Sequence, residues 1–487
     1  MKNNKRLWGL IPAAGKGQRA RPYTREVHKG LLDINGKPTI VRIIDIMRDD
    51  MGISDIVIVL GYLGDSIRET LGDGQKFGVR LHYIENNNLE RGLAWSIALS
   101  AKRFEGFCCV MLCDECYIHS NHSELASSFP YEQYYASCAG LQVEDENLIQ
   151  KNYAIEYQGN RINALHEKPK TLTNDIMGSG TFILSPEFFV DLELAFADNN
   201  FGYIEFVDFI DTQIGQQKIV GYFPLIGTYI NINDRDSLHL AKYHDRIKNF
   251  SHQKISLLIY AEGDEKNIAF TLSRYRELGI FHEMVLVLGK THSYKEGEND
   301  NLPLLRIIRC SADINGYGEK IHHALKQLEG DIFIITEADY SFSNRDISKL
   351  LSYLPEADMV IGTRTTRQLI EQGSSMQGIV RIAHAFLGYL MELLWWNREC
   401  RFTDAGCTFR AIWRTSFQLI EKNLHEKGPA YSAEMMIELI EQRQRVIEIP
   451  VNYYNRSASQ QQHHRNPRTF FSFLKLILRK RLDLFFR

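Results

Sequence analysis

Short apolar runs that end in glycine or polar loops recur along this chain and alternate with helical patterns. In the first half, helical spacing marks Thr39–Asp50 and Ala94–Ala101. The strand candidates that alternate with such segments are Leu7–Pro12, Ile56–Leu60, Val110–Leu112 and Thr181–Leu184. A strand covered by helices on both faces is a continuous apolar run. The pattern therefore predicts an α/β fold with an open, mostly parallel sheet covered on both faces.

A second series of the same kind begins at Ile255, with the runs ISLLIYAE, MVLVLG, LRIIRC, DIFIITEAD and ADMVIGTR. Between the two series, Leu238–Lys254 is polar and rich in histidine, which predicts a helix followed by a linker. At 487 residues the chain exceeds the size of one hydrophobic core. We predict two open-sheet domains in tandem, residues 1–250 and 255–465, followed by a short tail, 466–487.

The charge balance and cysteine usage exclude several classes of protein. Lys plus Arg number 57 against 60 Asp plus Glu, a net charge of -3, so we expect no nucleic-acid partner. Eight cysteines and an N-terminal stretch unlike a signal peptide predict a cytoplasmic location. The longest apolar candidate, Ala385–Trp396, has twelve residues and contains Glu392, which is too short for a membrane span.

The first predicted strand is followed at once by small residues and then by two cations. The small residues are Ala13, Ala14, Gly15 and Gly17, and the cations are Arg19 and Lys29. Ligands of open α/β sheets bind beyond the carboxyl ends of the strands. Small residues let backbone N–H groups approach phosphate oxygens, while arginine and lysine neutralise the charge. The loop has neither the G-x-G-x-x-G nor the Walker pattern, so an ordinary tight turn is the alternative.

The stretch from Leu10 to Pro38 resembles the signature of the sugar-1-phosphate nucleotidylyltransferases, roughly G-x-G-x-R-x-x-P-x-T, then P-K, then G-K-P. The resemblance implies that Arg19 and Lys29 are catalytic and clamp the phosphates of an NTP and a sugar 1-phosphate, and that Ala13 to Gly17 bind the nucleotide. The family's proline before the lysine is His28 here, which alters the local turn.

Further matches follow in the order of that family. Asn87 and Gly92, in NNLERGLA, stand where the family contacts the nucleobase, and the base is left open because the family often has glutamine at the first position. Glu167-Lys168-Pro169 matches the family's E-K-P, in which the Glu holds sugar hydroxyls and the Lys holds the phosphate, and Gly180 lies in a stretch that resembles the sugar-side strand.

The implied cofactor of this first site is Mg²⁺, which prefers oxygen ligands. Asp114, after the run VMLC, stands at the family's catalytic metal-binding aspartate. Asn233 is the favoured second ligand and Asn231 the alternative. The implied reaction is in-line attack of the sugar-phosphate oxygen on the α-phosphorus of the NTP, with pyrophosphate as the leaving group.

Cys113-x-x-Cys116, with Cys109, His119 and His122 nearby, offers a zinc or redox pair as a competing interpretation of the same region. A second pair of cysteines that would complete a zinc site is missing. Small side chains buried at a strand end are the preferred interpretation.

The second half resembles the family 2 glycosyltransferases of the GT-A fold, especially those that transfer a sugar to polyprenyl phosphate. The matching stretches include NGYGEK, ITEADYS and TDAGCTFRA. The resemblance implies a Rossmann-like domain whose donor metal, Mg²⁺ or Mn²⁺, is held by Glu337 and Asp339. Its other implied site residues are Asp404 at the catalytic centre, Asp264 on the nucleotide, and Arg364 and Arg381 on the acceptor phosphate.

One departure from the glycosyltransferase pattern leaves two functional predictions open. The D-D-x-S of that family is missing, because MVLVLG runs directly into KTHS. The main hypothesis is a bifunctional enzyme of cell-surface glycan synthesis that makes a nucleotide sugar and transfers its sugar to a polyprenyl phosphate. The alternative keeps only the nucleotidylyltransferase, with a degenerate second domain that binds a membrane or a partner. A homo-oligomer is compatible with either.

The tail from Thr469 to Arg487 predicts a basic amphipathic helix. Phe470, Phe473 and Ile477 recur at helical spacing, and residues 465–487 hold seven Lys or Arg against one Asp, a net +6. Such a helix suits an anionic membrane surface, which predicts a peripheral location on the inner face of the cytoplasmic membrane. The alternative is a helix packed on a neighbouring domain or subunit.

Overall fold

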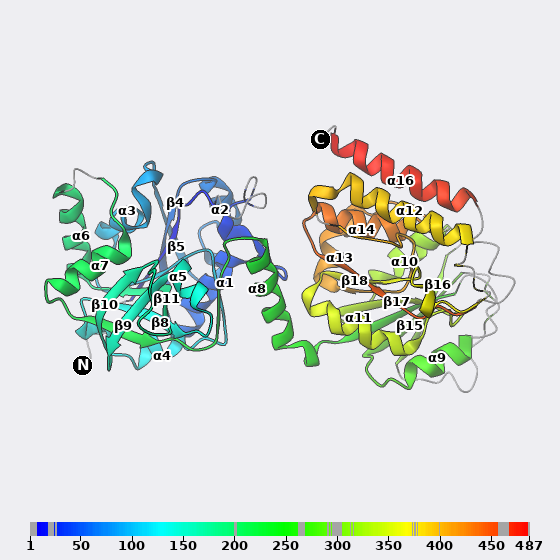
Figure 1. Ribbon diagram of the computed structural model, residues 1–487, viewed down its shortest axis with the longest axis horizontal. Helices are drawn as coiled ribbons and strands as arrows, with labels where there is room; N and C mark the ends of the chain where they lie inside the picture. Colours follow the sequence, from blue (N-terminus) through cyan, green and yellow to red (C-terminus); the bar gives the residue numbers. More distant parts are fainter. Residues whose placement is uncertain are drawn as a thin grey trace. The chain divides into compact units, whose positions relative to one another are not determined.

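The computed structural model (Figure 1) describes residues 7–17, 24, 27–198, 202–261, 268–289, 292, 294, 304–311, 313, 314, 316–372, 374, 376, 378–398, 400–455 and 467–485. The chain divides into two compact units, Met1–Asp245 and Arg246–Arg487. The division falls inside helix α8 (Arg235–Lys248), within the polar stretch that the sequence predicts as the boundary.

The described part of the first unit is built on a nine-stranded mixed sheet, in the order β5-β4-β1-β6-β11-β8-β12-β10-β9. The strands are β1 (Trp8–Ala13), β4 (Asp55–Leu60), β5 (Arg80–Glu85), β6 (Cys108–Met111), β8 (Ala136–Gln142), β9 (Tyr153–Gln158), β10 (Arg161–Glu167), β11 (Ile176–Leu184) and β12 (Val220–Pro224). Strands β5, β4, β1 and β6 run parallel, and β11 runs antiparallel to β6 and β8. Two small sheets pair β2 (Asp33–Ile34) with β3 (Lys37–Pro38) and β7 (Glu115–Ile118) with β13 (Thr228–Asn231).

Both faces of the first sheet are covered, as the sequence predicts. Alternate residues of β1 enter different cores: Ile11 belongs to one buried cluster and Leu10 to another. Successive side chains of a strand point to opposite faces, so these clusters lie on the two sides of the sheet. The helices are α1 (Thr39–Asp45), α2 (Gly64–Leu71), α3 (Gly92–Ala98), α4 (His122–Ser127), α5 (Glu146–Lys151), α6 (Pro186–Asp198), α7 (Phe206–Gly215) and α8.

The second unit repeats the strand order of the first. Its seven-stranded sheet runs β16-β15-β14-β17-β19-β18-β20, which matches β5-β4-β1-β6-β11-β8-β12 position by position. The directions match too, because only β19 runs antiparallel to its neighbours, as β11 does in the corresponding part of the first sheet. The strands are β14 (Ile255–Tyr260), β15 (Glu283–Gly289), β16 (Leu305–Cys310), β17 (Ile332–Glu337), β18 (Met359–Thr363), β19 (Arg410–Trp413) and β20 (Val446–Pro450).

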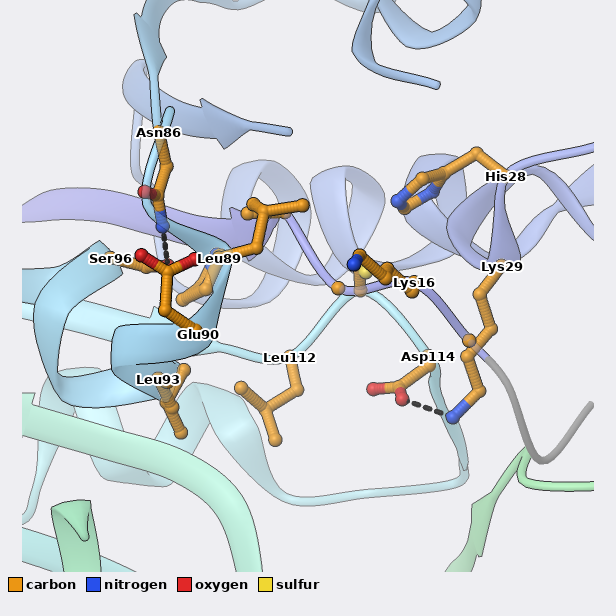
Figure 2. Close-up of a pocket in the computed structure, with 16 residues that line it drawn as sticks. Lys16, His28, Lys29, Asn86, Leu89, Glu90, Leu93, Ser96, Leu112 and Asp114 are labelled. Carbon is orange, nitrogen blue, oxygen red and sulfur yellow. Dashed lines mark hydrogen bonds and ion pairs between the residues drawn. The ribbon is translucent and has the colours of Figure 1, made fainter. Parts of the chain in front are cut away.

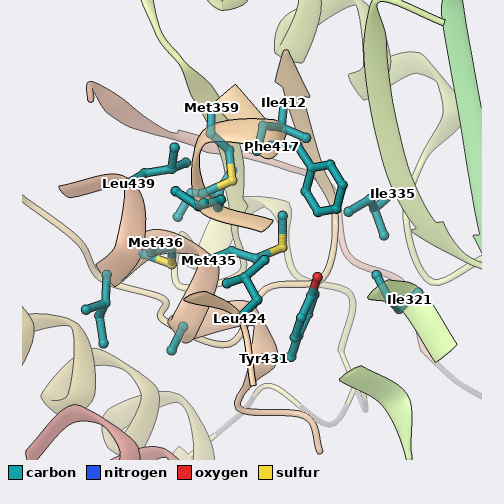
Figure 3. Packing of buried hydrophobic residues seen from close by; sticks show 14 of the residues in the cluster. Ile321, Ile335, Met359, Ile412, Phe417, Leu424, Tyr431, Met435, Met436 and Leu439 are labelled. Carbon is teal, nitrogen blue, oxygen red and sulfur yellow. The ribbon is translucent and has the colours of Figure 1, made fainter. Parts of the chain in front are cut away.

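Helices also cover this second sheet, with a large apolar core on one of its faces. Figure 3 shows part of that core, where Met359 and Ile412 of the sheet meet Phe417, Met435 and other buried side chains of the covering helices. The helices are α9 (Ile268–Arg276), α10 (Tyr317–Leu325), α11 (Ile347–Tyr353), α12 (Gly378–Leu394), α13 (Arg414–Ile420), α14 (Tyr431–Glu441) and α16 (Pro467–Phe485).

The C-terminal helix differs from its prediction as a separate tail. Helix α16 belongs to the second unit and packs on α12 and α14. Phe473, Leu476 and Ile477 are buried there, so the apolar stripe that the sequence assigned to a membrane is covered by protein. Lys480 is nearly buried and forms ion pairs with Glu434 and Glu438 at 2.9 and 2.6 Å. Among the described residues, no helix combines the length and apolarity needed to cross a bilayer.

Candidate active site

A cavity of about 660 Å³ opens beyond the carboxyl ends of β1 and β6 in the first unit (Figure 2). Strand β1 lies between β4 and β6, so the chain order reverses here, and open sheets bind ligands at such points. The lining residues are Pro12, Ala14, Gly15, Lys16, Gly17, His28, Lys29, Asn86, Leu89, Glu90, Gly92, Leu93, Ser96, Leu112, Cys113 and Asp114.

The glycine-rich loop lines one wall through Ala14, Gly15 and Gly17, whose predicted nucleotide binding stays a prediction. Gly17 has a φ of 56°, the left-handed region that glycine adopts without strain, and its carbonyl accepts a 2.7 Å hydrogen bond from Thr24 Oγ1. Ala13 ends β1 in the core, behind the cavity wall. Arg19, the predicted catalytic arginine, lies outside the described residues.

Lys29 and Asp114 meet in the cavity, although 85 residues separate them in the chain. They form an ion pair, and Lys29 Nζ also donates a 3.0 Å hydrogen bond to Asn233 Oδ1 (Figure 2 shows Lys29 and Asp114). One carboxylate oxygen and one amide oxygen therefore converge on one point. Such oxygen donors fit Mg²⁺, which takes few protein ligands and keeps water or phosphate in its other positions.

Asn231, the alternative second ligand, does not share this contact with Lys29. It ends β13 opposite Glu115, and its Oδ1 is buried. Among the described residues, Asn233 shares a contact with Asp114 through Lys29, and the choice between Asn233 and Asn231 as metal ligand stays a prediction.

His28 stands where the family signature has a proline, and its side chain stabilises the local turn through a hydrogen bond. Its Nδ1 accepts a 3.0 Å hydrogen bond from Gly30 N and so caps the short 3₁₀ turn Lys29–Leu31. Burial lowers the pKa of His28 to about 4, which keeps the ring neutral near pH 7 and able to accept that bond. The neutral imidazole of His28 therefore stabilises the turn that contains Lys29.

The cavity lining differs from the prediction at the position expected to contact the nucleobase. Asn87 is exposed and does not line the cavity, whereas Asn86 does. The backbone N–H of Asn86 donates to Leu60 O at 2.8 Å, which continues the pairing of β5 with β4 by one residue and turns the next side chain to the opposite side. Asn86 Nδ2 in turn donates to Ser96 Oγ at 3.0 Å (Figure 2), and Gly92 lines the same cavity.

A buried carboxylate that sequence reasoning missed lies directly behind Asp114. Glu115 Oε1 accepts hydrogen bonds from Gly180 N at 3.0 Å and from Tyr229 Oη at 2.6 Å, and Tyr117 Oη donates to Oε2. A Cβ on residue 180 would stand 2.5 Å from this carboxylate, so only glycine allows the approach. Burial, with Asp114 adjacent, raises the pKa of Glu115 to about 7. Glu115 thus joins β7, β11 and β13 behind the site.

The predicted sugar-phosphate residues lie outside the cavity wall. Glu167 and Lys168 form an ion pair with each other at 2.5 Å, and Lys168 has a φ of 43°. Burial raises the pKa of Glu167 despite this pair. Their roles in substrate binding remain predictions.

The cysteines of this cluster lie in the interior of the first unit. Cys113 and Cys116 are buried free thiols, and the described residues contain no group of three or more His, Cys, Asp or Glu side chains arranged for a metal ion. His122, which the zinc interpretation would use, instead lies 2.7 Å from Ser120 Oγ and 3.2 Å from Thr181 Oγ1.

His122 yields a testable pH dependence. Burial lowers its pKa from 6.5 to about 4, so between these pH values the unfolded chain binds a proton that the folded chain does not. Acidification through this window should therefore cost about 3 kcal/mol of unfolding free energy. We expect His122→Gln to flatten the pH dependence of denaturant unfolding by that amount. The exposed His119→Asn control should leave it unchanged, and equal slopes for all three proteins would contradict the assignment.

In the second unit, Glu337 ends strand β17 and Asp339 follows it. Strand β17 occupies the place of β6, so Asp339 follows it as Asp114 follows β6. Glu337 Oε1 accepts a 2.6 Å hydrogen bond from Thr408 Oγ1, and Asp339 Oδ1 accepts one from Ser341 N at 3.0 Å. Asp264, the predicted nucleotide contact, lies outside the described residues.

The positions of Arg364 and Asp404 differ from the prediction that Arg364 binds an acceptor phosphate. Both side chains are fully buried and form a bidentate ion pair, with Nε–Oδ2 and Nη2–Oδ1 distances of 2.8 and 2.9 Å. Burial alone would raise the pKa of Asp404, but Arg364 holds that pKa well below its usual range. Arg364 is therefore held in the interior and does not present its guanidinium to an acceptor phosphate in this conformation. Arg381 is partly exposed and donates to Thr365 O at 3.3 Å.

Comparisons with known proteins find relatives of the first unit. Residues 8–229 match the family model described as Nucleotidyl transferase. The low-salt glycan biosynthesis nucleotidyltransferase Agl11 of Haloferax volcanii is 32% identical over 190 residues, which cover 38% of this chain and 51% of that protein. The chain thus spans about half the length of Agl11.

Two further proteins are similar over nearly their whole length. The UTP–glucose-1-phosphate uridylyltransferase AglF of Haloferax volcanii is 24% identical over 233 residues, 47% of this chain and 94% of that protein. A solved UDP-glucose pyrophosphorylase in complex with UDP-glucose shares 21% identity with a TM-score of 0.42, over 50% of this chain and 99% of that one. The N-terminal half of this chain therefore carries a nucleotidyl transferase domain, and sugar-1-phosphate nucleotidyltransferases are among its homologues.

Proposed function

We propose that the first unit transfers a nucleotidyl group from an NTP to a sugar 1-phosphate and releases pyrophosphate. The observation that carries the proposal is the convergence of Lys29, Asp114 and Asn233 beside the glycine-rich loop, at the switch point of the sheet. The names of the relatives, uridylyltransferase and thymidylyltransferase, make UTP and dTTP the first nucleotides to test.

The residues of the cavity divide the chemistry among them. Backbone N–H groups of Ala14 to Gly17 face phosphate oxygens, and Lys29 neutralises the charge that develops on them. Asn86 and Gly92 border the space for the base. Mg²⁺ would be held by Asp114 and Asn233 and would supply further charge neutralisation. The chain orients two phosphorylated substrates for in-line attack and needs no covalent intermediate.

A substrate panel tests this proposal. The protein is incubated with Mg²⁺, each NTP and a series of sugar 1-phosphates, and pyrophosphate is measured. We expect release only when an NTP and a sugar 1-phosphate are both present, and loss of release when the metal is chelated. Absence of pyrophosphate with every pair would overturn the proposal.

We further propose that the second unit uses the nucleotide sugar as a glycosyl donor, with a polyprenyl phosphate as acceptor and Mg²⁺ or Mn²⁺ at Glu337 and Asp339. Its strand order supports the proposal, because it places Asp339 where the first unit has Asp114. A polyprenyl acceptor is held in a membrane, so transfer would take place at a membrane surface, on the cytoplasmic side where nucleotide sugars are made.

The alternative is a second unit that binds a membrane or partner without catalysis. The closed Arg364–Asp404 pair favours it, because both predicted site residues are buried against each other. Adding polyprenyl phosphate to the reaction above separates the two. Glycolipid formation that Asp339→Asn abolishes and the exposed Asp313→Asn leaves intact would support transfer. A nucleotide sugar that accumulates unchanged in both variants and the parent would support the alternative.

A further inference from the structure

Helix α12 carries a row of large apolar side chains on its outward face. They are between 52% and 81% exposed: Ile379, Ile382, Phe386, Tyr389, Leu393 and, in the turn that follows, Trp396. Their spacing of three and four residues places them along one stripe. The opposite face packs on the core through Leu387 and Met391. A surface helix normally keeps its outward face polar, so this second apolar face needs a partner.

The row continues onto α16, which lies along α12 (Figure 1). The rings of Phe386 and Phe470 are 6.4 Å apart, and those of Phe470 and Phe471 are 5.6 Å apart. Phe471 is 61% exposed and lies on the side of α16 that faces away from buried Phe473 and Ile477. The outward residues of both helices therefore form one apolar surface, which we name the α12–α16 face.

Two cations lie beside this surface, and Asp483, four residues after Arg479, is an exposed acid on the same side of α16. Lys475 and Arg479 follow Phe471 at intervals of four residues, so they share its side of α16, and both are exposed. Within the described parts of the chain, neither forms an ion pair. Lys480 shows the contrast, because it points inward and is paired with Glu434 and Glu438.

We propose that the α12–α16 face docks on a lipid bilayer with anionic headgroups. The apolar row would insert at the boundary of the acyl chains, and Tyr389 and Trp396 would lie at the depth of the headgroups. Lys475 and Arg479 would attract the anionic headgroups. The inserting residues thus belong mainly to α12, whereas the apolar stripe of α16 fixes the helix to the protein. A two-fold dimer through this face is disfavoured, because it brings the same cations of two copies together. The inference goes beyond the proposed activities and requires neither.

Vesicle binding of the full chain tests the proposal. Vesicles of phosphatidylcholine are compared with vesicles that also contain phosphatidylglycerol. We expect tighter binding to the anionic vesicles. Ile379→Ser with Leu393→Ser should weaken binding to both kinds at least about tenfold. The control, Tyr353→Ser with Leu419→Ser, removes two apolar side chains that are 47% and 45% exposed on α11 and α13 and should change binding less than about twofold.

Charge variants separate the electrostatic part. Lys475→Gln with Arg479→Gln should weaken binding to anionic vesicles about twentyfold and leave binding to phosphatidylcholine unchanged. The control, Arg276→Gln with Lys422→Gln, removes two other exposed cations and should have no such effect. Pyrophosphate release in solution verifies that each variant is intact and stands apart from the vesicle result.

Three outcomes would overturn the proposal. The first is that the parent protein binds neither kind of vesicle. The second is that the variant with Ile379→Ser and Leu393→Ser binds as well as the parent does. The third is that sedimentation shows a dimer of the parent, which this variant converts to a monomer with no change in vesicle binding. In that case a second copy of the chain covers the α12–α16 face.

Discussion

Replacing Asp114 by asparagine is expected to lower the kcat of pyrophosphate release about a thousandfold. Asparagine has nearly the same shape and can still accept a hydrogen bond from Lys29, so the wall of the cavity is preserved. What disappears is the negative charge that pairs with Lys29 and that would hold Mg²⁺ together with Asn233. The expected loss is therefore electrostatic and should appear in kcat at saturating substrate and metal.

The matched control for this variant is Asp65→Asn. Asp65 is an exposed carboxylate in the first turn of α2, in the same unit but outside the cavity lining. Its substitution should leave kcat within about twofold, because an exposed charge contributes little. A kcat for Asp114→Asn within tenfold of the parent would contradict the role assigned to this carboxylate.

Replacing Arg364 by methionine is expected to lower the free energy of unfolding of the second unit by about 3–5 kcal/mol. Methionine fills much of the volume of the arginine stem, so the loss comes mainly from the Asp404 carboxylate, which is left fully buried without its partner. Denaturant unfolding of the full chain measures the change as a shift in midpoint.

Two companion variants make the second prediction specific. Arg276→Met removes an exposed arginine of α9 and should change stability by less than about 0.5 kcal/mol. Arg364→Met combined with Asp404→Leu removes both charges and should recover much of the loss. An unchanged midpoint for the Arg364→Met single variant would show that the pair does not stabilise the fold.

The sheet and half of the candidate site follow from sequence patterns. Apolar runs that end before polar residues predicted β1 and β6, and neighbouring parallel strands bring their carboxyl ends together. That rule alone places the loop after β1 near Asp114. The meeting of Lys29 with Asn233, 204 residues later, additionally required the resemblance to a known family.

The errors have physical reasons that the sequence does not display. Asn87 was predicted from its position in a family motif, and the motif does not show that strand pairing continues one residue beyond β5 and turns Asn86 toward the cavity. Arg364 and Asp404 looked like separate site residues because their pairing depends on tertiary contacts across 40 positions.

The two apolar helices of the second unit show a further limit. An amphipathic pattern reveals that α16 has an apolar face but not what covers it, and the structure shows that protein does. The sequence of α12 shows only that its apolar stretch is too short to span a membrane. The structure distinguishes the outward row of α12 from the opposite face, which packs in the core.

The central claim is that Lys29, Asp114 and the glycine-rich loop serve transfer of a nucleotidyl group through the α-phosphorus. The most direct measurement uses an NTP labelled at its α-phosphate, incubated with the protein, Mg²⁺ and a sugar 1-phosphate. The account predicts that the label appears in a nucleotide sugar and that the released pyrophosphate carries none. Label that stays in the NTP, or that is released as a nucleoside monophosphate without a nucleotide sugar, would contradict it.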